Sequence, residues 1–517
     1  MHDRRWWTLA VLCLSLTVIS IDNTILNVAL PHIVADIDAS GSQLQWIIDS
    51  YTLIFACLLL TSGSLGDKLG RKGVLTIGLV IFGVFSAVAA MSGSATTLIL
   101  ARGVMGVGGA CIFPSTLSIL TNVFQGPERA KAIGIWAGVS GLGVAIGPLV
   151  GGLLLEHFWW GSVFLVNVPI CAVAIVMGRF FIPKTRDDHD SRLDPVGAVC
   201  SIVGLLGLLF GIIEGPDRGW TSTGVLTGFA MAIVFIGTFA WWESRYSHPM
   251  LDVRFFKNPR FSVASATVTL TNFALFGSTF LLTQYFQFVL EYSPLKAGMM
   301  TAPVAVGLMA TAPNTTRFVG RFGTKYVVVF GLGMVMCALL LYASDTIMSS
   351  VFLGGFVRIL FGAGMGCVAA PATESIMGSL PKEKAGVGSA VNDTTRQTGG
   401  ALGVAVIGSI FVARYRAVID VPRGLTSAQA ADVQDSIGRA LGVARQLPLR
   451  AAEIHDAAAD AFKTAMHLVY PISATIVFGA AMLAWKYLPA RAVDPMADPV
   501  TDPLDDLLAE GASVSGT

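Results

Sequence analysis

A series of long apolar segments constrains this chain more than any other feature of its sequence. Each segment holds about 20 predominantly apolar residues, the length that an α-helix needs to cross a bilayer. Charged residues make up only 13% of the chain, whereas soluble proteins carry roughly 25%. The chain therefore has too few charged residues to cover the surface of a soluble fold. We therefore predict an all-α integral membrane protein. The candidate spans, about fourteen, are 8–34, 45–65, 74–94, 98–121, 132–154, 161–182, 195–213, 222–242, 262–288, 297–315, 325–343, 350–373, 388–413 and 466–487.

Basic residues alternate between the loops that connect these segments. Because cytoplasmic loops carry the excess of lysine and arginine, the alternation predicts cytoplasmic termini and favours an even number of spans. The expected location is the cytoplasmic (inner) membrane, crossed many times. The intervening loops are acidic or nearly neutral, and the basic residues gather at 4–5, 68–72, 129–131, 184–192, 245–260, 317–325, 382–384 and 486–491.

Two polar segments stand apart from the apolar ones. Residues 415–465 are polar and rich in alanine, and the predicted topology makes them an extracellular loop. Residues 491–517 are acidic and punctuated by proline, a composition typical of disorder. We expect this last segment to be a disordered cytoplasmic tail.

The chain lacks the short motifs that indicate catalysis, nucleotide binding or a metal site. It contains no G-x-x-x-x-G-K-[ST], no G-x-S-x-G and no H-E-x-x-H, and its cysteines form no C-x-x-C pair. Each of these motifs brings together groups that such chemistry requires. A net charge of +1 offers no basic surface for nucleic acid. We expect no catalytic residue, no metal, no cofactor and no nucleic-acid partner.

The stretch IDNTILNVALP at 21–31 places Asp22 near the middle of the first apolar segment. A charge at mid-bilayer costs a few kcal/mol and marks a functional or paired group by default. One interpretation is a structural hydrogen bond to Asn23, Thr24 or Asn27. The other is a coupling carboxyl that holds a proton or a cationic substrate in turn.

Other charged residues fall inside or at the ends of apolar segments, and four of them are candidate functional residues. Arg102 can extend to the interface from the start of its segment, or it can belong to a buried site. Asp49 can attract cations at the outer mouth or be an ordinary interfacial residue. Asp393 and Arg396 are three residues apart on one helical face, so they can neutralise each other or face a cavity.

Small residues crowd the segment 132–154. Glycines about four residues apart let two helix backbones approach closely. Generic membrane packing explains isolated pairs, but this density, with a proline that permits bending, favours a sliding seam between two halves of the protein. The residues of this seam are Gly143, Gly147, Pro148, Gly151 and Gly152.

The loop GSLGDKLGRKG at 63–73 combines glycines, which permit a tight turn, with an acidic residue among basic ones. A basic loop on the cytoplasmic side explains Arg71 and Lys72 by itself. It does not explain the spacing of the glycines or the aspartate, which can sit against the N-terminus of a neighbouring helix. We interpret Gly63, Asp67, Gly70, Arg71 and Lys72 as a cytoplasmic gating loop.

These motifs occur in the order found in a known family. The loop resembles the signature of the major facilitator superfamily, and LILARGVMGVGGA at 98–110 and GVAIGPLVGG at 143–152 resemble its next two motifs. The last of these is similar to the element that exporters share. IDNTILNVALP resembles the first-span motif of the drug:proton antiporters, and NVP at 167–169 adds to the match. The span count indicates the fourteen-span, EmrB/QacA-type branch. The second-half counterpart of the loop, RFVGRFGTK at 317–325, lacks the aspartate.

The resemblance implies a major facilitator fold of two six-helix bundles plus two additional helices. The corresponding domains are residues 1–190, the linker helices 191–260, the second bundle 261–490 with its loop at 415–465, and the tail 491–517. It also implies that Arg102 faces the first span and tunes a proton site at Asp22. Arg396 and Gln397 belong to a recurring element that lines a central cavity.

The expected function is proton-coupled export, by antiport and alternating access, of amphipathic and cationic drugs or dyes. The partners would be small molecules, protons and the lipid bilayer, the proton gradient would drive transport, and the chain would act as a monomer. Export of an endogenous lipid, siderophore or peptide metabolite is the alternative. The seam disfavours a symporter, and the missing motifs disfavour an enzyme. The expected cavity residues are Asn23, Asn27, Asp49, Gln284, Tyr285, Gln287, Asp393, Arg396 and Gln397, with Phe276, Phe280 and Phe286 as aromatic lining.

Overall fold

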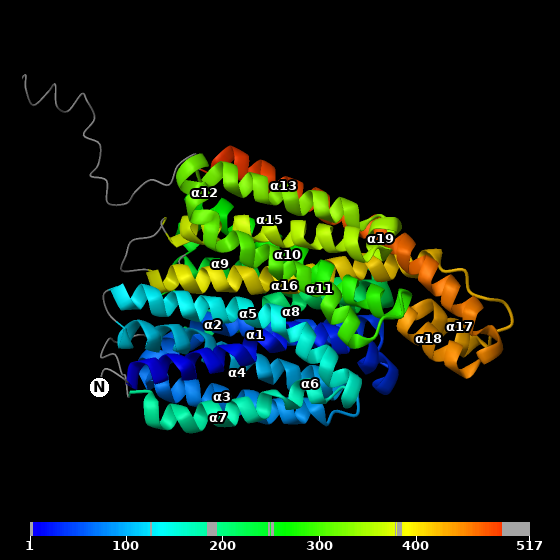
Figure 1. Cartoon of the computed structure of the whole chain (residues 1–517), viewed down its shortest axis with the longest axis horizontal. Helices are drawn as coiled ribbons and strands as arrows, with labels where there is room; N and C mark the ends of the chain where they lie inside the picture. Colours follow the sequence, from blue (N-terminus) through cyan, green and yellow to red (C-terminus); the bar gives the residue numbers. More distant parts are fainter. Residues whose placement is uncertain are drawn as a thin grey trace, which may run out of the picture.

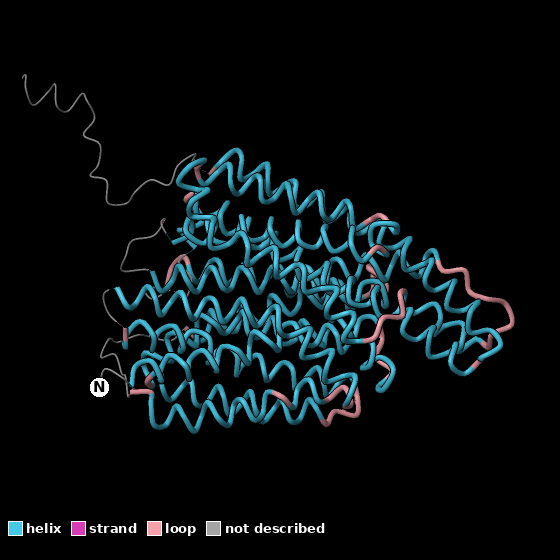
Figure 2. The backbone as a smooth tube through the Cα atoms, in the orientation of Figure 1, coloured by secondary structure: helices cyan, strands magenta, loops and turns pink. Residues whose placement is uncertain are grey.

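The computed structural model describes residues 4–124, 127–183, 194–246, 249, 253–377, 379 and 385–488. Every regular element within these residues is a helix (Figure 2). The shorter ones are α6 (Ser162–Leu165), α12 (Thr315–Phe322), α14 (Asp345–Ser349), α17 (Ser427–Asp435), α18 (Ile437–Gln446), the 3₁₀ turns η1 (Val253–Lys257), η3 (Ala312–Asn314) and η5 (Pro448–Arg450), and the π-helix η2 (Tyr285–Val289). The longer ones are α1 (Arg4–Ile37), α2 (Gly41–Leu69), α3 (Arg71–Ala90), α4 (Ala95–Val123), α5 (Pro127–His157), α7 (Asn167–Phe181), α8 (Pro195–Arg218), α9 (Thr223–Glu243), α10 (Pro259–Gln284), α11 (Pro294–Thr311), α13 (Thr324–Tyr342), α15 (Val351–Met377), α16 (Ala385–Val418) and α19 (Ala451–Tyr487).

The long helices run side by side in one bundle (Figure 1). Helices α1 to α7 pack mainly against one another and form a first helical group, and α10 to α19 form a second. The two groups meet where α5 packs against α11 and where α2 packs against α16. Helices α8 and α9 pair with each other, and α8 contacts both α2 and α16. The predicted domain boundaries stay a prediction, and the tail 491–517 lies outside the described residues.

The all-helical prediction is confirmed, because each of the predicted apolar segments lies on a helix. Eleven helical segments of the described chain are long and apolar enough to cross a membrane. Helices α2, α5 and α11, which carry several glycines, prolines and polar residues, are not among them. The count of fourteen spans therefore stays a prediction.

Local sequence signals fix where several helices begin. Ser40 caps α2, since its hydroxyl accepts a hydrogen bond from the backbone of Gln43 while the Gln43 side chain bonds back to Ser40. This reciprocal arrangement satisfies two backbone donors that a helix start leaves free. Gly70 and Gly323 turn the chain between adjacent helices with φ angles of 94° and 92°, a conformation that glycine adopts without a steric penalty.

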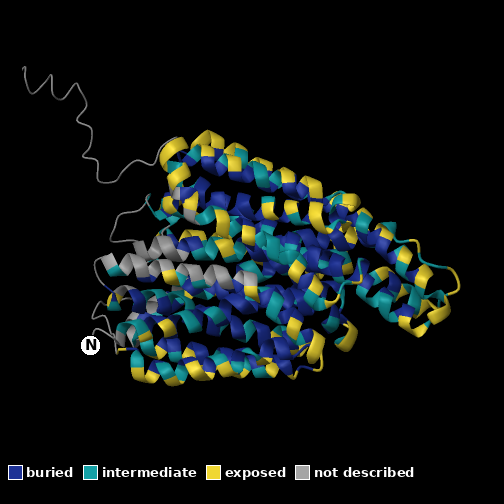
Figure 3. Cartoon of the chain, in the orientation of Figure 1, coloured by how far each residue is buried: buried dark blue, intermediate teal, exposed yellow. Residues whose placement is uncertain are grey.

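Exposed residues cover the outside of the bundle (Figure 3), and many of them are as apolar as the residues of its interior. Helix α9 shows this most clearly, because only 17% of its apolar stretch is buried inside the protein. Ile233 and Val234 on this helix are 75% and 59% exposed. Water would penalise such a surface, whereas lipid tails are as apolar as these side chains. The outer faces of the bundle are thus suited to contact with lipid.

Residues 415–465, predicted as an extracellular loop, consist mostly of helix. They include the ends of α16 and α19 nearest the loop, and between these the short helices α17 and α18. We call residues 415–465 the hairpin. In Figure 1 the hairpin projects beyond one end of the bundle, opposite the end where the described chain begins. We call these the hairpin end and the terminal end. Thr426 and Gln429 cap α17 with the same reciprocal pair of bonds that starts α2.

Candidate functional site

Asp22 and Arg102 form a buried ion pair between α1 and α4. Arg102 Nη1 contacts Asp22 Oδ2, and the two residues are 0% and 1% exposed. The guanidinium also donates from Nε to the backbone oxygen of Ile47 at 3.2 Å. Its carbon atom lies 4.3 Å from the centroid of the Tyr51 ring, within the range of a cation–π interaction. The structure therefore brings these two predicted residues together.

Asn167 holds the second oxygen of the same carboxylate. Its Nδ2 donates to Asp22 Oδ1 at 3.2 Å and to Ser86 Oγ at 3.4 Å. The Asp22 carboxylate thus bonds to α4 and α7, whereas Thr24 bonds to the backbone of α1 itself. Sequence reasoning gave Asn167 and Tyr51 no role. The NVP motif was the available signal for Asn167.

A cavity lies beside this pair, between the two helical groups. It holds about 1190 Å³ free of protein atoms, a volume that includes open solvent. Its wall is mostly apolar, with several amide, hydroxyl and charged side chains. The lining residues are Ile19, Ser20, Asn23, Thr24, Asn27, Phe55, Phe113, Pro148, Asn272, Leu275, Phe276, Thr279, Leu282, Thr301, Ala302, Val304, Ala305, Asp393, Arg396 and Gln397.

Five of the predicted cavity residues lie in this wall: Asn23 and Asn27 from α1, and Asp393, Arg396 and Gln397 from α16. Asp393 and Arg396, both described, form no ion pair with each other, so the arrangement is that of separate charges on one wall. Asp22 itself does not line the cavity, although the next residue of the chain does.

The other predicted cavity residues lie elsewhere in this conformation. Asp49 is buried in α2, and neither of its carboxylate oxygens has a hydrogen-bond partner among the described residues. Gln284 lies in a smaller pocket beside the hairpin. Tyr285 is buried with its ring 6.4 Å from that of Phe462. Gln287 donates to the backbone oxygen of Val28 at 2.9 Å, and so it joins the two groups.

The glycines of α5 face two different helices. A Cβ atom added at Gly143 would lie 2.3 Å from Ser20 Cβ, and one at Gly147 would lie 2.0 Å from Thr24 Oγ1. One at Gly151 would lie 2.7 Å from Ile25 Cγ1, so these three glycines bring α5 against α1 within the first group. Only Gly152 and the Pro148 backbone meet the second group, at Leu295 and Gly298 of α11. The predicted contact between halves is thus made by Gly152 and Pro148.

The predicted gating loop lies at the terminal end. Gly70 ends α2 and begins α3. Arg71 donates to the backbone oxygen of Ser118 in α4 at 3.4 Å. Lys72 donates to the backbone oxygens of Arg179 and Ile182 at 3.0 and 2.7 Å, which ties the turn to the end of α7. The backbones of Gly63 and Asp67 belong to α2, and the side chain of Asp67 lies outside the described part of the structure.

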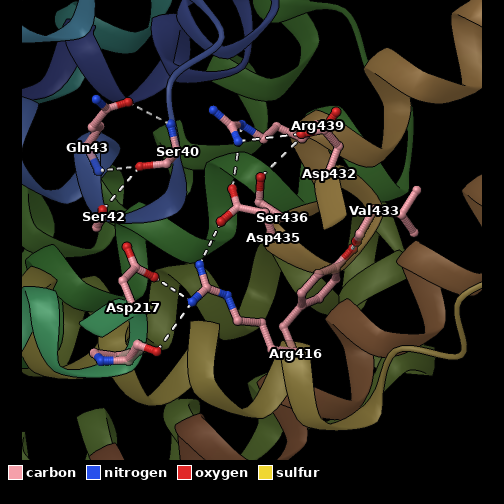
Figure 4. Close-up of polar contacts among 12 residues, drawn as sticks. Ser40, Ser42, Gln43, Asp217, Arg416, Asp432, Val433, Asp435, Ser436 and Arg439 are labelled. Carbon is pink, nitrogen blue, oxygen red and sulfur yellow. Dashed lines mark hydrogen bonds and ion pairs between the residues drawn. The ribbon is translucent and has the colours of Figure 1, made fainter. Parts of the chain in front are cut away.

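At the hairpin end, ion pairs connect the hairpin to both helical groups and to α8. Figure 4 shows those that Arg416 forms. Arg416 of α16 lies 2.5 Å from Asp217 of α8 and 2.6 Å from Asp435 of α17. Arg439 of α18 lies 3.3 Å from the side chain of Asp38, which follows α1. The hairpin therefore bridges elements that would separate if this end of the bundle opened.

The fold and the site together define a membrane transport protein, with a cavity between two helical groups and a buried ion pair beside it. The chain belongs to the Major Facilitator Superfamily, whose sequence model matches residues 12–404. This confirms the resemblance inferred from the motifs and makes the protein a multi-pass membrane transporter rather than an enzyme.

Individual relatives agree with this assignment. The multidrug efflux pump LfrA of Mycolicibacterium smegmatis is 38% identical over 483 residues, which cover 92% of this chain and 95% of LfrA. The methyl viologen resistance protein SmvA of Salmonella typhimurium is 34% identical over 466 residues, which cover 89% and 93%. A bacterial homologue of the human lysosomal transporter Spinster, solved in an inward-facing and occupied conformation, superimposes with a TM-score of 0.66 at 16% identity and covers 95% of this chain and 99% of that one. That likeness supports the major facilitator fold.

Proposed function

We propose that the protein is a proton-coupled secondary exporter that moves amphipathic, cationic drugs or dyes by alternating access. The observation that carries the proposal is the buried Asp22–Arg102 pair directly behind the cavity wall. The names of the relatives, a multidrug efflux pump and a methyl viologen resistance protein, support export of organic cations. Their extensive coverage of this chain supports a shared activity.

The geometry suggests separate sites for the proton and the cargo. Asp22 faces Arg102 and Asn167, away from the cavity, whereas Asp393 is the carboxylate among the described lining residues. A cationic cargo would be attracted to Asp393 and would pack on aromatic side chains such as Phe55 and Phe276. A proton arriving at Asp22 would neutralise the carboxylate and so weaken its attraction to Arg102. The proton would be carried by Asp22 and the cargo by Asp393.

Helix α1 would couple the two sites. Asp22 is followed by Asn23 and Thr24, which line the cavity, and α1 packs closely on the glycines of α5. Loosening the ion pair would let α1 shift against α4, which changes the wall that the cargo contacts. A ligand biases a two-state equilibrium only through such a difference in contacts between the states.

The conformation described here is one of the two states that alternating access requires. Gln287 bonds across the two groups, Ser293 Oγ donates to Glu156 at 2.7 Å, and the hairpin bridges both groups. All of these contacts are at the hairpin end, which is therefore closed. The hairpin end would face the exterior and both termini the cytoplasm, since the basic loops gather at the terminal end. We further propose residence in the cytoplasmic membrane, action as a monomer, and transport driven by the proton gradient without a cofactor.

Proton-driven export of a fluorescent cationic dye by everted membrane vesicles tests this function. Asp22→Asn keeps the size of the side chain but cannot ionise, so we expect it to abolish proton-driven export. Asp460→Asn changes a carboxylate at the hairpin end that is 78% exposed, and we expect normal export. Full proton-driven export by Asp22→Asn would refute the assignment of the coupling site.

A further inference from the structure

The amide side chain of Asn167 leaves one buried hydrogen-bonding atom unused beside Asp22. Asn167 begins α7 and is fully buried, and its Nδ2 donates to Asp22 and Ser86. Its Oδ1, although also buried, has no hydrogen-bond partner among the described residues. Leaving a buried acceptor unpaired costs about 1–3 kcal/mol, so its presence next to a carboxylate needs a physical account.

The amide can bond to Asp22 in either protonation state. An ionised carboxylate only accepts hydrogen bonds, whereas a protonated carboxyl also donates one. The Asn167 nitrogen now faces Asp22 Oδ1, which is the arrangement that suits an ionised carboxylate, because two acceptors would repel. A turn of the amide about its last side-chain bond would present Oδ1 instead. That atom could then accept the hydrogen bond of a protonated Asp22.

We propose that Asn167 is a positioning residue for proton coupling. It holds the ionised Asp22 in line with Arg102, and it receives the proton-bearing oxygen when Asp22 becomes neutral and the ion pair loosens. The proposal rests on the proposed function, because it assigns a role in proton coupling to a residue that touches the coupling carboxyl. Asn167 would thereby set how tightly the proton is held.

The surroundings of Asp22 contain few other groups that could do this. The charged or titratable neighbours include Arg102 of α4, Tyr51 of α2 and Cys171 of α7. Helices α5 and α10 also pack on α1, and they offer no charge at that depth. Their sequences contain no charged residue between Lys131 and Glu156 or between Arg260 and Glu291.

A purely structural role predicts a different outcome. Asn167 also links α7 to α3 through Ser86, and this link alone would contribute to stability without affecting the proton. Asn167→Asp keeps the size of the side chain, and its carboxylate can accept a hydrogen bond from the Ser86 hydroxyl in place of the one that Asn167 Nδ2 donates, but it replaces the donor facing Asp22 with an acceptor. Asn167→Leu removes both. Ser86→Ala removes the link to α3 and keeps the contact with Asp22.

The test measures how binding of tetraphenylphosphonium to the full-length protein in lipid nanodiscs depends on pH. Protons oppose cation binding both at Asp393, which lines the cavity, and at Asp22, so the affinity should fall below a midpoint pH to which both carboxyls contribute. Because Asn167 contacts Asp22 and does not line the cavity, a shift in its variants reports on Asp22. Without the Asn167 donor, the ionised carboxylate is less stable and Asp22 takes up its proton more readily. We expect the midpoint to rise by about one pH unit in Asn167→Asp, which loses the donor and keeps an acceptor, and by less in Asn167→Leu, which loses both. Ser86→Ala should lower thermal stability and keep the wild-type midpoint.

Each result bears on one hypothesis. Wild-type midpoints in both Asn167 variants would overturn the positioning role, and if Asn167→Leu does not fold, the nearly isosteric Asn167→Asp decides alone. A midpoint that moves in Ser86→Ala as far as in Asn167→Asp would also overturn it. By contrast, a wild-type protein whose cation binding ignores pH, or an Asp22→Asn variant with the wild-type midpoint, would contradict the proposed function itself.

Discussion

Arg102 and Arg358 occupy matching places in the two helical groups, but among the described residues only Arg102 meets a carboxylate. In α4 and in α15, glycines follow the arginine after four and after six residues. The second glycine packs against a glycine of α3 in the first group and of α13 in the second. The two arginines are buried to the same extent, at 1% exposure each. The two helical groups thus share the glycine packing around the arginine, but they differ in what the arginine contacts.

The surroundings of Arg358 are aromatic and apolar. Its Nε and Nη1 have no hydrogen-bond partner among the described residues, and Nη2 lies 3.8 Å from the sulfur of Met300. The guanidinium carbon is 5.1 Å from the centroid of the Phe286 ring, where the negative face of the ring attracts a cation. The difference between the groups shows that the repeated framework does not itself require an ion pair. The carboxylate in the first group is an addition to that framework, which is consistent with the coupling role proposed for it.

The largest effect should come from breaking the ion pair. Arg102→Leu leaves the Asp22 carboxylate buried without a counter-charge, which typically costs about 3–5 kcal/mol. We expect a loss of that size in the free energy of unfolding, measured at pH 8 by reversible unfolding in mixed micelles. The cost arises from Asp22, so Asp22→Asn introduced into Arg102→Leu should restore most of the stability. A double variant as unstable as the single one would show that Arg102 contributes through its packing and not through the pair.

Much of the framework that carries this pair could be predicted from the sequence. Apolar length located each long helix, and the turns at Gly70 and Gly323 lie inside motifs that the two halves share. The pairing of Asp22 with Arg102 followed from the cost of isolated charges in a membrane and from the family resemblance. These features are local in the chain or repeated along it, and for that reason a sequence shows them.

The features that sequence reasoning missed depend on which face a helix presents to its neighbour. Asn167 lies in a motif whose sequence gives no direction for the side chain, and only packing of α7 on α1 brings it to Asp22. Similarly, Gln284 and Gln287 are three residues apart, yet the π-helix that begins at Tyr285 changes the turn of the chain between them. One consequently lies in the pocket beside the hairpin and the other bonds to α1.

An intermediate effect should come from the close glycine packing between two helices that occurs inside each helical group. Gly147 packs on α1 as Gly403 of α16 packs on α10, where an added Cβ would lie 2.3 Å from the backbone oxygen of Phe273. Gly147→Ala would force the two helices apart, and overpacking of this kind costs about 1–3 kcal/mol. We expect lower stability and slower dye export in everted vesicles. Gly237→Ala on α9, where nothing lies within 4 Å of the added Cβ, is the matched control and should be neutral or slightly stabilising. If Gly147→Ala and Gly237→Ala lost equal stability and export rate, the close packing of α5 on α1 would have no special role.

The smallest effect, with the opposite sign, should come from the unpaired arginine. Arg358→Met removes a buried charge that has no acidic partner and fills the space with a flexible apolar side chain. The gain is offset by the lost contact with Phe286, so we expect stability to be unchanged or raised by about 1 kcal/mol. Arg358→Lys keeps the charge without the flat guanidinium and should be less stable than Arg358→Met, because a lysine ammonium is more strongly hydrated. Reversible unfolding of the three proteins in the same micelles provides the comparison. If Arg358→Met instead lost as much stability as Arg102→Leu, then an acidic group must meet Arg358 in the membrane, and the contrast between the two helical groups would disappear.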